Sequence, residues 1–377
     1  MIGFRQRTAA RLERWHRSDR VRVRPALRGA VETIDFAGND YLGLAREPRV
    51  IAACARAAER YGVGATGSAL ISGHTDAHAE LESALAAFTG RPRALVFGSG
   101  YLANLAVVTT FAGRNETVIQ DRLNHASLID AAILSRARLL RYAHANPAAL
   151  ATCLQRVEPG RALVVTDGVF SMDGDLAPLP ALAALCSGHQ SPFVVDDAHG
   201  FGVLGAHGGG SAEYHGLGMD EVPILIGTFG KAFGGAGAFV AGDEAIIDAL
   251  IQFGRTYIYT TAPPPALMGA MTASLRIIVS EPERRDRLRA NIACFRQCAE
   301  LRGLPVGAST TAIQPVFLGN AAATLHAART LRDKGYRVAA IRPPTVPAGT
   351  ERLRITISAA RTVAEIEGLV AALAALA

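Results

Sequence analysis

Short apolar runs, rich in β-branched residues, alternate with helix-like stretches from about residue 90 to residue 242. The runs read "ALVF", "TVIQD", "RLLRYA", "RALVVTDG", "PFVVDDA", "ILIGTF" and "AFVAG". Near-continuous apolar runs are typical of strands that are buried on both faces, and helices between such runs are typical of parallel connections. The pattern therefore predicts an α/β domain in which helices cover both faces of a mostly parallel, seven-stranded sheet.

The rest of the chain predicts a second, smaller domain of the α+β class. After "TTAPPPAL" come two helical stretches, near 263–280 and 283–302, and then the strand-like runs "AIQPVFLG", "YRVAAI" and "RLRITIS" among further helices. The chain of 377 residues is long enough for both domains. We expect an N-terminal segment at 1–45, a large domain at 46–280 and a small C-terminal domain at 281–377.

The positive charge of the chain is concentrated at its N-terminus. The net charge is +6, but residues 1–28 hold nine arginines against Glu13 and Asp19, so this arm carries +7 and the other residues −1. We expect a solvated amphipathic helix and no nucleic-acid partner, and an RNA-binding segment is the rival interpretation. One or two arginines near "DRVRVRP" also suit an anionic substrate, because a planar guanidinium binds both oxygens of a carboxylate or phosphate.

Membrane, secreted and disulfide-rich classes are not favoured. No apolar run approaches the roughly eighteen residues needed to cross a bilayer, and the N-terminus lacks the apolar core of a signal peptide. The acidic residues of the arm argue against an organelle transit peptide, so we expect the cytoplasm. Five cysteines without a C-x-x-C pair predict buried thiols, with neither a disulfide framework nor a metal site.

Polar residues follow five of the predicted strands at the point where each strand ends. They lie in "FGSGY", "DRLNHAS", "DGVFSMDGD", "DDAHG" and "TFGK". In open α/β sheets, ligands bind beyond the carboxyl ends of the strands. The sequence therefore predicts one site at this edge of the sheet.

A glycine pattern at the first strand end has three interpretations. Gly98, Gly100 and Ala103 fit G-x-G-x-x-G/A, and Asp121 lies about twenty residues further on, as in a dinucleotide-binding fold. A tight turn and another kind of phosphate site fit equally well. In each of the two binding cases, the backbone N–H groups of Gly100 and Tyr101 at a helix start can hold an anion.

Lys231 stands in "LIGTFGKAFGG", after an apolar run and inside a glycine-rich turn. It is not a Walker lysine, because G-x-x-x-x-G-K requires glycine where this chain has Leu225. The alternatives are a surface lysine and a reactive amine. Flanking glycines favour the second, because they let the backbone approach a planar ligand closely.

Asp196 and His199 end a strand that the sequence predicts to be buried. A buried carboxylate is costly unless it is paired, and a protonated pyridine nitrogen, an arginine or a helix cap would each serve. Asp197 comes next and should face the opposite side of the strand.

His125 fits either a core histidine or a ring stacked on an aromatic ligand. "HGGGS", at 207–211, resembles an esterase oxyanion loop, but no G-x-S-x-G supplies a nucleophile, so we expect a glycine loop.

Taken in order, "FGSGYLAN", "LNHAS", "FSMDGD", "DDAHG" and "TFGKAFGG" resemble the α-oxoamine synthases among the fold-type I pyridoxal-phosphate enzymes, over essentially the whole chain. "NDYLGL" and "IRPPTVPAGTERLRIT" are similar to the members that condense L-alanine with a pimeloyl thioester of coenzyme A or acyl carrier protein. Sister enzymes of the glycine C-acetyltransferase and 5-aminolevulinate synthase types share the other motifs. The resemblance implies a homodimer, in which Thr260 or Thr261 reaches the partner's phosphate.

The resemblance also assigns roles to individual residues. Lys231 would form the Schiff base with pyridoxal 5'-phosphate, Asp196 would pair with the pyridine nitrogen, His199 would bond the ring hydroxyl and His125 would stack on the ring and meet substrate. Cofactor oxygens would be bound by Gly100, Tyr101, Ser171 and Thr228. Substrate would be bound by Arg354, Thr345 and an arm arginine, Arg20 or its near neighbour Arg22. The resemblance gives no role to His74 and His78.

Overall fold

The computed structural model describes residues 2–18, 20–24, 26 and 33–376. Asp19 and Arg28 of the predicted basic arm lie outside the described residues. The chain divides into two compact units. The sheet unit comprises 39–171 and 175–287, and the terminal unit comprises 1–38, 172–174 and 288–377. The domain boundaries near residues 45 and 280 stay predictions.

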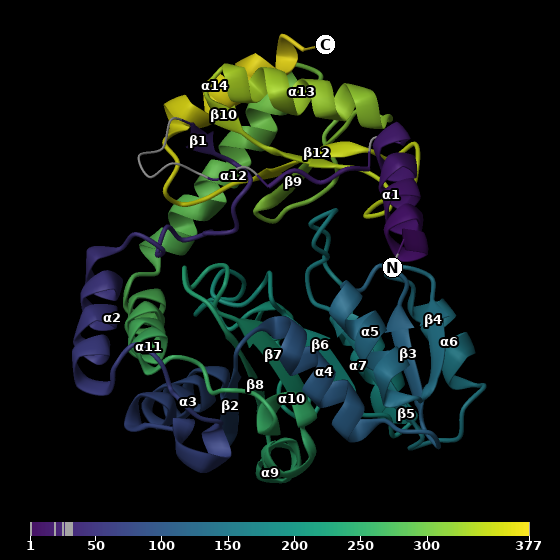
Figure 1. Ribbon diagram of the computed structural model, residues 1–377, viewed down its shortest axis with the longest axis vertical. Helices are drawn as coiled ribbons and strands as arrows, with labels where there is room; N and C mark the ends of the chain where they lie inside the picture. The colour runs from purple at the N-terminus through teal and green to yellow at the C-terminus, as the bar shows by residue number, and fades with distance from the viewer. Residues whose placement is uncertain (1, 19, 25, 27–32, 377) are drawn as a thin grey trace. The chain divides into compact units, whose positions relative to one another are not determined.

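The sheet unit is built on seven strands in the order β2-β8-β7-β6-β5-β3-β4 (Figure 1). All pairs from β7 to β4 are parallel, whereas β8 is antiparallel to both of its neighbours. The connection from β7 to β8 is too short for the crossover that a parallel pair requires. The predicted mostly parallel, seven-stranded sheet is confirmed. The strands are β2 (Arg93–Phe97), β3 (Thr117–Asp121), β4 (Arg138–Tyr142), β5 (Ala162–Asp167), β6 (Phe193–Asp196), β7 (Ile224–Thr228) and β8 (Ala238–Gly242).

Strand side chains alternate between two apolar clusters, one on each face of this sheet. On β5, Leu163 and Val165 belong to one cluster and Val164 to the other, as the two-residue period of a strand requires. Helices α4 (Gly100–Phe111), α5 (Ala126–Ser135) and α9 (Glu244–Phe253) contribute to the first cluster, and α6 (Pro147–Leu154) and α7 (Leu179–Gly188) to the second. Burial on both faces explains why the strands read as continuous apolar runs.

The sheet unit carries further helices around this core. Helix α11 (Pro265–Ser280) packs against α2 (Pro48–Tyr61) and α3 (Asp76–Thr89). The shorter elements are the π-helix η1 (Ala69–Gly73), α8 (Ser211–Tyr214) and α10 (Arg255–Ile258).

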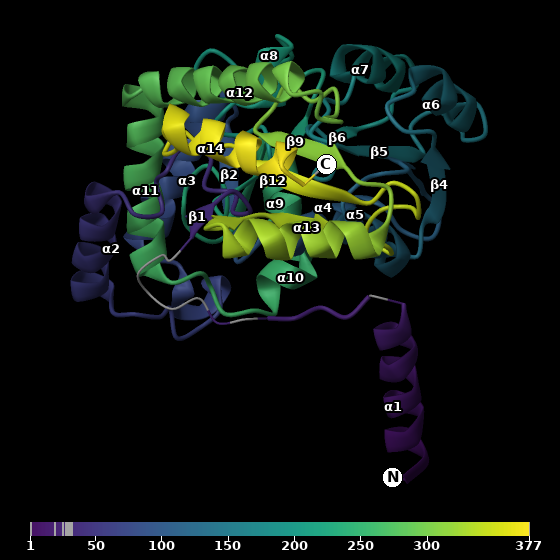
Figure 2. The same ribbon diagram turned by 90° about the horizontal axis from the view of Figure 1, so that it is seen from above.

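The terminal unit contains a three-stranded antiparallel sheet in the order β11-β12-β9, formed by Ala339–Ile341, Arg352–Thr356 and Ile313–Phe317. In the same unit, β1 (Ile34–Asp35) from the N-terminal part pairs with β10 (Tyr336–Arg337). Helix α13 (Ala321–Asp333) packs on β11, β12 and α14 (Val363–Ala374). Figure 2 shows α13 and α14 in this unit. This unit also holds most of α12 (Glu283–Leu301).

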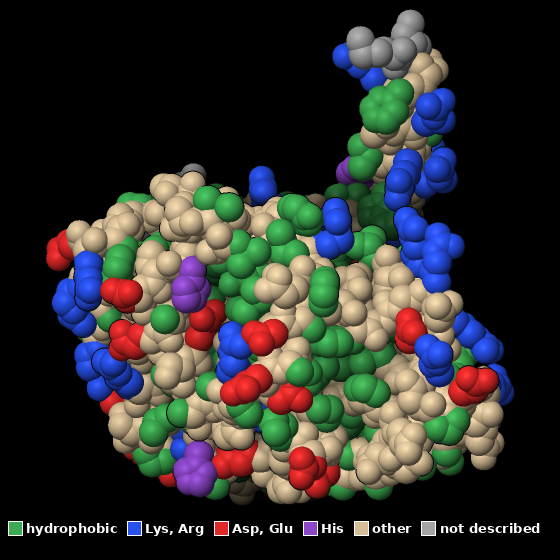
Figure 3. All heavy atoms as spheres, turned by 90° about the horizontal axis from the view of Figure 1, so that it is seen from below, with side chains coloured by type: hydrophobic (Ala, Val, Ile, Leu, Met, Phe, Trp, Pro, Cys, Tyr) green, Lys and Arg blue, Asp and Glu red, His purple; other side chains and the backbone are tan. Residues whose placement is uncertain are grey.

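The basic arm begins with helix α1 (Ile2–Arg17). Its described side chains are exposed except for Trp15, which is half-buried. The arginine side chains of this helix lie along it in Figure 3. No helix within the described ranges combines the length and apolarity needed to cross a membrane.

Candidate active site

A pocket of about 190 Å³ lies where strands of the sheet unit end. Its lining includes all eight residues predicted to bind the cofactor, namely Gly100, Tyr101, His125, Ser171, Asp196, His199, Thr228 and Lys231. These residues follow five different strands, whose carboxyl ends meet at this edge. Asn104, Asp167, Val169 and Ala198 complete the lining.

Lys231 is held by the turn that joins β7 to β8. The Thr228 hydroxyl donates to the Gly237 carbonyl (2.9 Å) and accepts from the Gly230 N–H (3.3 Å), so both ends of the turn are fixed. The Gly234 N–H donates to the Lys231 carbonyl (2.9 Å). Of the 39 lysines and arginines in the chain, only Lys231 and Lys334 are lysines. A primary amine can act as a nucleophile, whereas a guanidinium stays protonated.

Asp196 is buried at the end of β6, with its carboxylate oriented by two donors. The Asn104 side-chain amide donates to Oδ2 (2.6 Å), and the Ala198 N–H donates to Oδ1 (3.1 Å). No arginine is among these partners. A fixed buried carboxylate at a pocket wall is suited to pair with a cation that enters the pocket.

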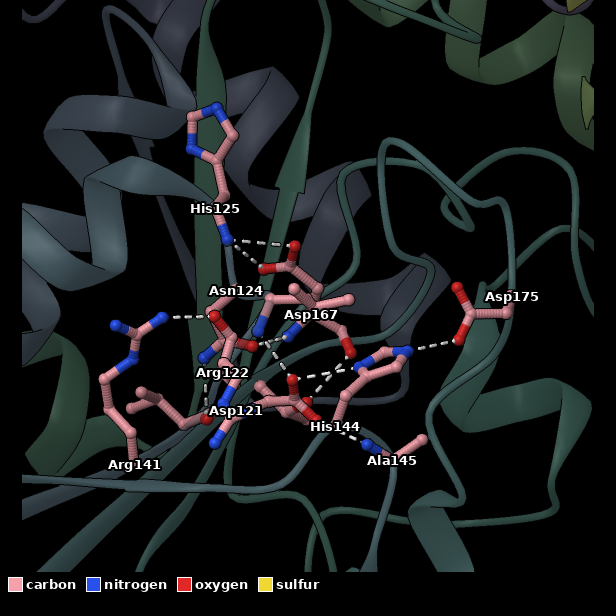
Figure 4. A network of polar contacts seen from close by, with 12 residues as sticks. Asp121, Arg122, Asn124, His125, Arg141, His144, Ala145, Asp167 and Asp175 are labelled. Atoms are coloured by element: carbon pink, nitrogen blue, oxygen red, sulfur yellow. Dashed lines mark hydrogen bonds and ion pairs between the residues drawn. The ribbon is translucent and has the colours of Figure 1, made fainter. Parts of the chain in front are cut away.

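His125 caps helix α5 from the end of β3. Its backbone N–H donates to the Asp167 carboxylate (3.1 Å to Oδ2), and its ring lies away from Asp167, as Figure 4 shows. Burial lowers the pKa of His125, with the nearby Lys231 acting in the same direction. Burial also raises the pKa of Asp167 well above its ordinary value, and the neighbouring Asp196 carboxylate adds to this effect.

His199 contacts a residue from the N-terminal part of the sheet unit. The Tyr41 hydroxyl lies 2.6 Å from His199 Nδ1, and the Tyr41 side chain is almost fully buried. The rings are tilted, with centroids 6.1 Å apart. Tyr41 therefore fixes the orientation of the His199 ring.

The N-terminus of helix α4 faces the pocket through Gly100 and Tyr101. Ser99 caps this helix, because its hydroxyl accepts from the Leu102 N–H (3.3 Å). The first N–H groups of a helix have no partner within the helix and carry partial positive charge. The arrangement suits a phosphate group.

Ser171 stands in a loop whose base is anchored by a charged cluster, drawn in Figure 4. His144 contacts Asp121 (3.0 Å) and Asp175 (2.7 Å), and its ring packs edge-on against Phe170. Burial alone would lower the pKa of His144, but the two carboxylates outweigh it and raise this pKa to about 10. A protonated His144 thus ties Asp175, and the loop with Ser171, to the ends of β3 and β4.

This cluster also argues against the interpretation of the glycine pattern as the dinucleotide-binding site of an NAD-dependent dehydrogenase. Asp121 is fully buried and accepts from the N–H groups of Leu123 (2.8 Å) and Ala145 (2.7 Å) in addition to contacting His144. Four strands separate β2 from β3 in the sheet. A dinucleotide site requires neighbouring strands and an acid that reaches the ribose, and neither condition is met.

The predicted substrate-binding residues Arg354, Thr345 and Arg20 belong to the terminal unit. Arg354 is buried on β12, where its Nη1 donates to the Thr356 hydroxyl (3.0 Å). Thr345 is exposed, and the exposed Arg20 guanidinium lies over the Trp15 ring at 5.6 Å. Their roles stay predictions.

Asp197 faces away from the pocket, as the strand period predicts. Its Oδ2 accepts from the Ser211 N–H (2.5 Å). A Cβ at Gly210, where φ is +95°, would clash with this oxygen. Burial raises the pKa of Asp197 to about 6. "HGGGS" is therefore a glycine loop that encloses this carboxyl.

Two of the five thiols, Cys153 and Cys186, are buried, whereas Cys54, Cys294 and Cys298 are half-buried. Burial raises the pKa of the Cys186 thiol to about 12.

Comparison with known proteins identifies the class. The family model described as "Aminotransferase class I and II" matches residues 31–373, and the chain belongs to this family. An 8-amino-7-oxononanoate synthase of Stutzerimonas stutzeri is 57% identical over 339 residues, which are 90% of this chain and 86% of that protein. A Pseudomonas putida protein of the same name is 53% identical over 375 residues, covering 97% of this chain and 96% of its own.

Solved structures similar to this chain agree with the sequence comparison. A serine palmitoyltransferase from S. paucimobilis, with a bound PLP–myriocin aldimine, has a TM-score of 0.88 at 34% identity and covers 91% of this chain and 87% of its own. An 8-amino-7-oxononanoate synthase from Francisella tularensis has a TM-score of 0.79 at 33% identity, with coverages of 91% and 97%. The predicted family, the transferase class and pyridoxal phosphate as cofactor are confirmed.

The sequence did not indicate three residues that shape the site. Asn104, Asp167 and Tyr41 contact Asp196, His125 and His199 across separations of 92, 42 and 158 residues. Each stands inside a quoted motif, but only the fold shows its partner. For Asn104 a signal was available, since it lies four residues after Gly100 and so on the same helix face.

Proposed function

We propose that this protein condenses L-alanine with a pimeloyl thioester, releasing carbon dioxide and the free thiol and giving 8-amino-7-oxononanoate for biotin synthesis. The observation that carries the proposal is the pocket that gathers Lys231, Asp196, His199 and His125 at the ends of neighbouring strands. The relatives at 53% to 57% identity support the choice of reaction.

The chemistry of the lining residues fits pyridoxal phosphate. Lys231 supplies an amine for the aldehyde, and the buried Asp196 suits the pyridinium nitrogen. The N–H groups at the start of α4 suit the phosphate, while His125, His199, Ser171 and Thr228 would contact the ring and its oxygens. When bound, this cofactor supplies an electron sink conjugated to the α-carbon of the amino acid.

The residues of the chain have distinct tasks in this reaction. The Lys231 amine takes the α-proton of alanine and later returns a proton, acting as general base and then acid. The Asp196 carboxylate stabilises positive charge at the far end of the pocket. Arg354 binds the alanine carboxylate until it leaves as carbon dioxide. Arg20 would meet the acyl substrate, and Thr345 would contact substrate.

A sister reaction is the alternative, because solved serine palmitoyltransferases share this fold at 34% identity. Sequence identity favours the alanine reaction, since the relatives named for it reach 57%. The test offers alanine, glycine and serine to the purified protein with acetyl, succinyl, pimeloyl and palmitoyl thioesters, and measures free thiol and carbon dioxide. We expect alanine with a pimeloyl thioester to give the fastest release. Preference for another pair would overturn the proposal, and the two carriers of the pimeloyl group are compared in the same assay.

We further propose that the protein is a cytoplasmic homodimer. Ile71 and Tyr259 are large side chains that are 84% and 72% exposed, and the segments that carry them are joined by the Ala262 N–H donating to the Gly67 carbonyl (3.0 Å). Exposed apolar side chains on adjoining segments suit an interface with a second copy. Thr260 and Thr261 adjoin Tyr259 and would reach the partner's phosphate. Sedimentation of wild type and of Ile71→Asp should show dimer and weakened dimer, and a monomeric wild type would contradict this proposal.

A further inference from the structure

The hydrogen bonds to His125 define which ring nitrogen carries the proton. The Ser127 N–H lies 3.3 Å from His125 Nδ1, and the Ser127 hydroxyl lies 2.7 Å from the same atom. A backbone N–H can only donate, so Nδ1 accepts and carries no proton. This contact is also the N-cap of helix α5, which therefore depends on an unprotonated Nδ1.

The direction of the next hydrogen bond follows from Asn104. Its Nδ2 donates to the Ser127 hydroxyl (2.7 Å) and to Asp196 Oδ2 (2.6 Å). The amide cannot be flipped, because its oxygen would then face the Asp196 carboxylate. Since the Ser127 oxygen accepts from Asn104, its own hydrogen is directed to His125 Nδ1. Asn104 and Ser127 are both fully buried, so water does not compete for these bonds.

We propose that Asn104 and Ser127 are positioning residues that link the Asp196 carboxylate to the His125 ring and hold this ring neutral, with its single proton on Nε2. The inference rests on the proposed function, because it concerns the same pocket. A neutral ring can stack on a planar cofactor without placing a second positive charge beside the pyridinium. The Nε2–H remains as a directional donor at the pocket wall.

The charges around His125 act in both directions. Burial lowers its pKa most strongly and Lys231 lowers it further, whereas Asp196 and Asp130 raise it. The Asp167 carboxylate contacts the backbone N–H of His125. The N-terminus of α5 disfavours an imidazolium as well. The hydrogen bonds to Nδ1 add a geometric requirement, because they are lost when Nδ1 is protonated.

The experiment records ring ¹⁵N resonances of the histidine-labelled holoenzyme as a function of pH, with His125 identified through the His125→Gln variant. We expect Nε2 to be protonated and Nδ1 unprotonated near neutral pH. Ser127→Ala keeps the backbone N–H at Nδ1 but removes the hydroxyl donor, so Nδ1 should stay the unprotonated nitrogen while the titration midpoint of His125 rises. Asn104→Asp should raise the midpoint by about one pH unit or more, because the Ser127 hydroxyl turns toward the new carboxylate. Ser127→Thr keeps the hydroxyl and should restore the wild-type midpoint.

The matched control is Ser274→Ala. Ser274 is also fully buried in the sheet unit, where its hydroxyl donates to the Phe233 carbonyl (2.9 Å). This variant should leave the His125 resonances unchanged. The inference is overturned if wild-type His125 carries its proton on Nδ1 or is charged near neutral pH, or if Ser127→Ala and Ser274→Ala have the same effect. The readout requires no turnover, so it is independent of which substrates the enzyme uses.

Discussion

Asp167 and Asp196 end the neighbouring parallel strands β5 and β6 in the same register, so two buried carboxyl groups lie on one face of the sheet. Asp196 is fixed by Asn104 and Ala198, whereas Asp167 accepts from the His125 backbone. The pKa of Asp167 is raised by burial and then by Asp196. The two carboxyl groups therefore have different roles. Asp196 is oriented to pair with a cation in the pocket, and Asp167 holds the backbone of His125.

Asp167→Asn should stabilise the protein at neutral pH. The folded pKa of Asp167 lies above the unfolded value of 3.8, so ionisation of this carboxyl is disfavoured in the folded state. The protonated carboxyl therefore contributes its full stability below pH 3.8, and this stability is lost as the pH rises through the folded pKa. The amide can still accept from the His125 N–H and carries no charge. We expect a gain on the order of 1 kcal/mol at pH 7.5 that shrinks toward pH 4, measured by denaturant unfolding. A loss of stability that is equal at both pH values would contradict this account.

Asp196→Asn should retain the cofactor but lose turnover. The neutral amide no longer stabilises the pyridinium, so kcat should fall by roughly a hundredfold or more. Absorbance measures cofactor binding, and thiol release measures turnover. The control is Asp197→Asn, an isosteric change at the next residue, which faces away from the pocket and should keep turnover within a few-fold. Normal turnover in Asp196→Asn would refute the role of this carboxylate.

His144→Gln tests the cluster at the base of the Ser171 loop. The pKa of His144 is raised to about 10, so its stabilising effect is full below pH 6.5 and is lost as pH rises through 10. We expect the variant to lose about 1–3 kcal/mol of unfolding free energy at pH 7. The deficit should shrink as the pH approaches 10.

The comparison variant is His207→Gln, because His207 also pairs with a carboxylate, Glu213, but is 83% exposed. An exposed ion pair contributes little, so this change should cost less than about 1 kcal/mol. Equal losses in the two variants, or a loss at His144 that does not depend on pH, would argue against a protonated His144.

His78, which the sequence left without a role, should be a stabilising residue. Its Nδ1 accepts from the Thr75 N–H (3.1 Å) in the capping box of α3, and its Nε2 donates to the Pro263 carbonyl (2.8 Å). Burial lowers its pKa, so this stabilisation is present above pH 6.5 and is lost as pH falls through the folded pKa. His78→Ala should cost about 2 kcal/mol at pH 7.5. His74→Ala, at a more exposed ring, should cost less in the same unfolding assay, and the reverse order would disprove the assignment.

The sequence predicted the strands and the polar residues at their ends because both are local patterns. Apolar runs mark buried strands, and the carboxyl ends of parallel strands place Lys231, Asp196 and His125 together by geometry alone. The antiparallel direction of β8 could also have been predicted, since its connection to β7 is too short for the crossover that a parallel pair requires.

Pairings between distant segments could not be predicted in this way. The contact of Tyr41 with His199 and the pairing of β1 with β10 join residues that are 158 and about 300 positions apart. No periodicity within either segment specifies such a partner. The same limit applies to Asn104, whose motif was visible but whose two acceptors come from other elements.

The central claim is that the amine at residue 231 carries the cofactor, and the composition of the chain makes it directly testable. Borohydride reduction of the purified holoenzyme, followed by peptide mass mapping, should place the reduced cofactor on Lys231. Lys334, the other lysine, is exposed in the terminal unit, and Lys334→Arg should leave the label in place, whereas Lys231→Ala should abolish it. A label on Lys334 or on the N-terminus, or no label, would contradict the account.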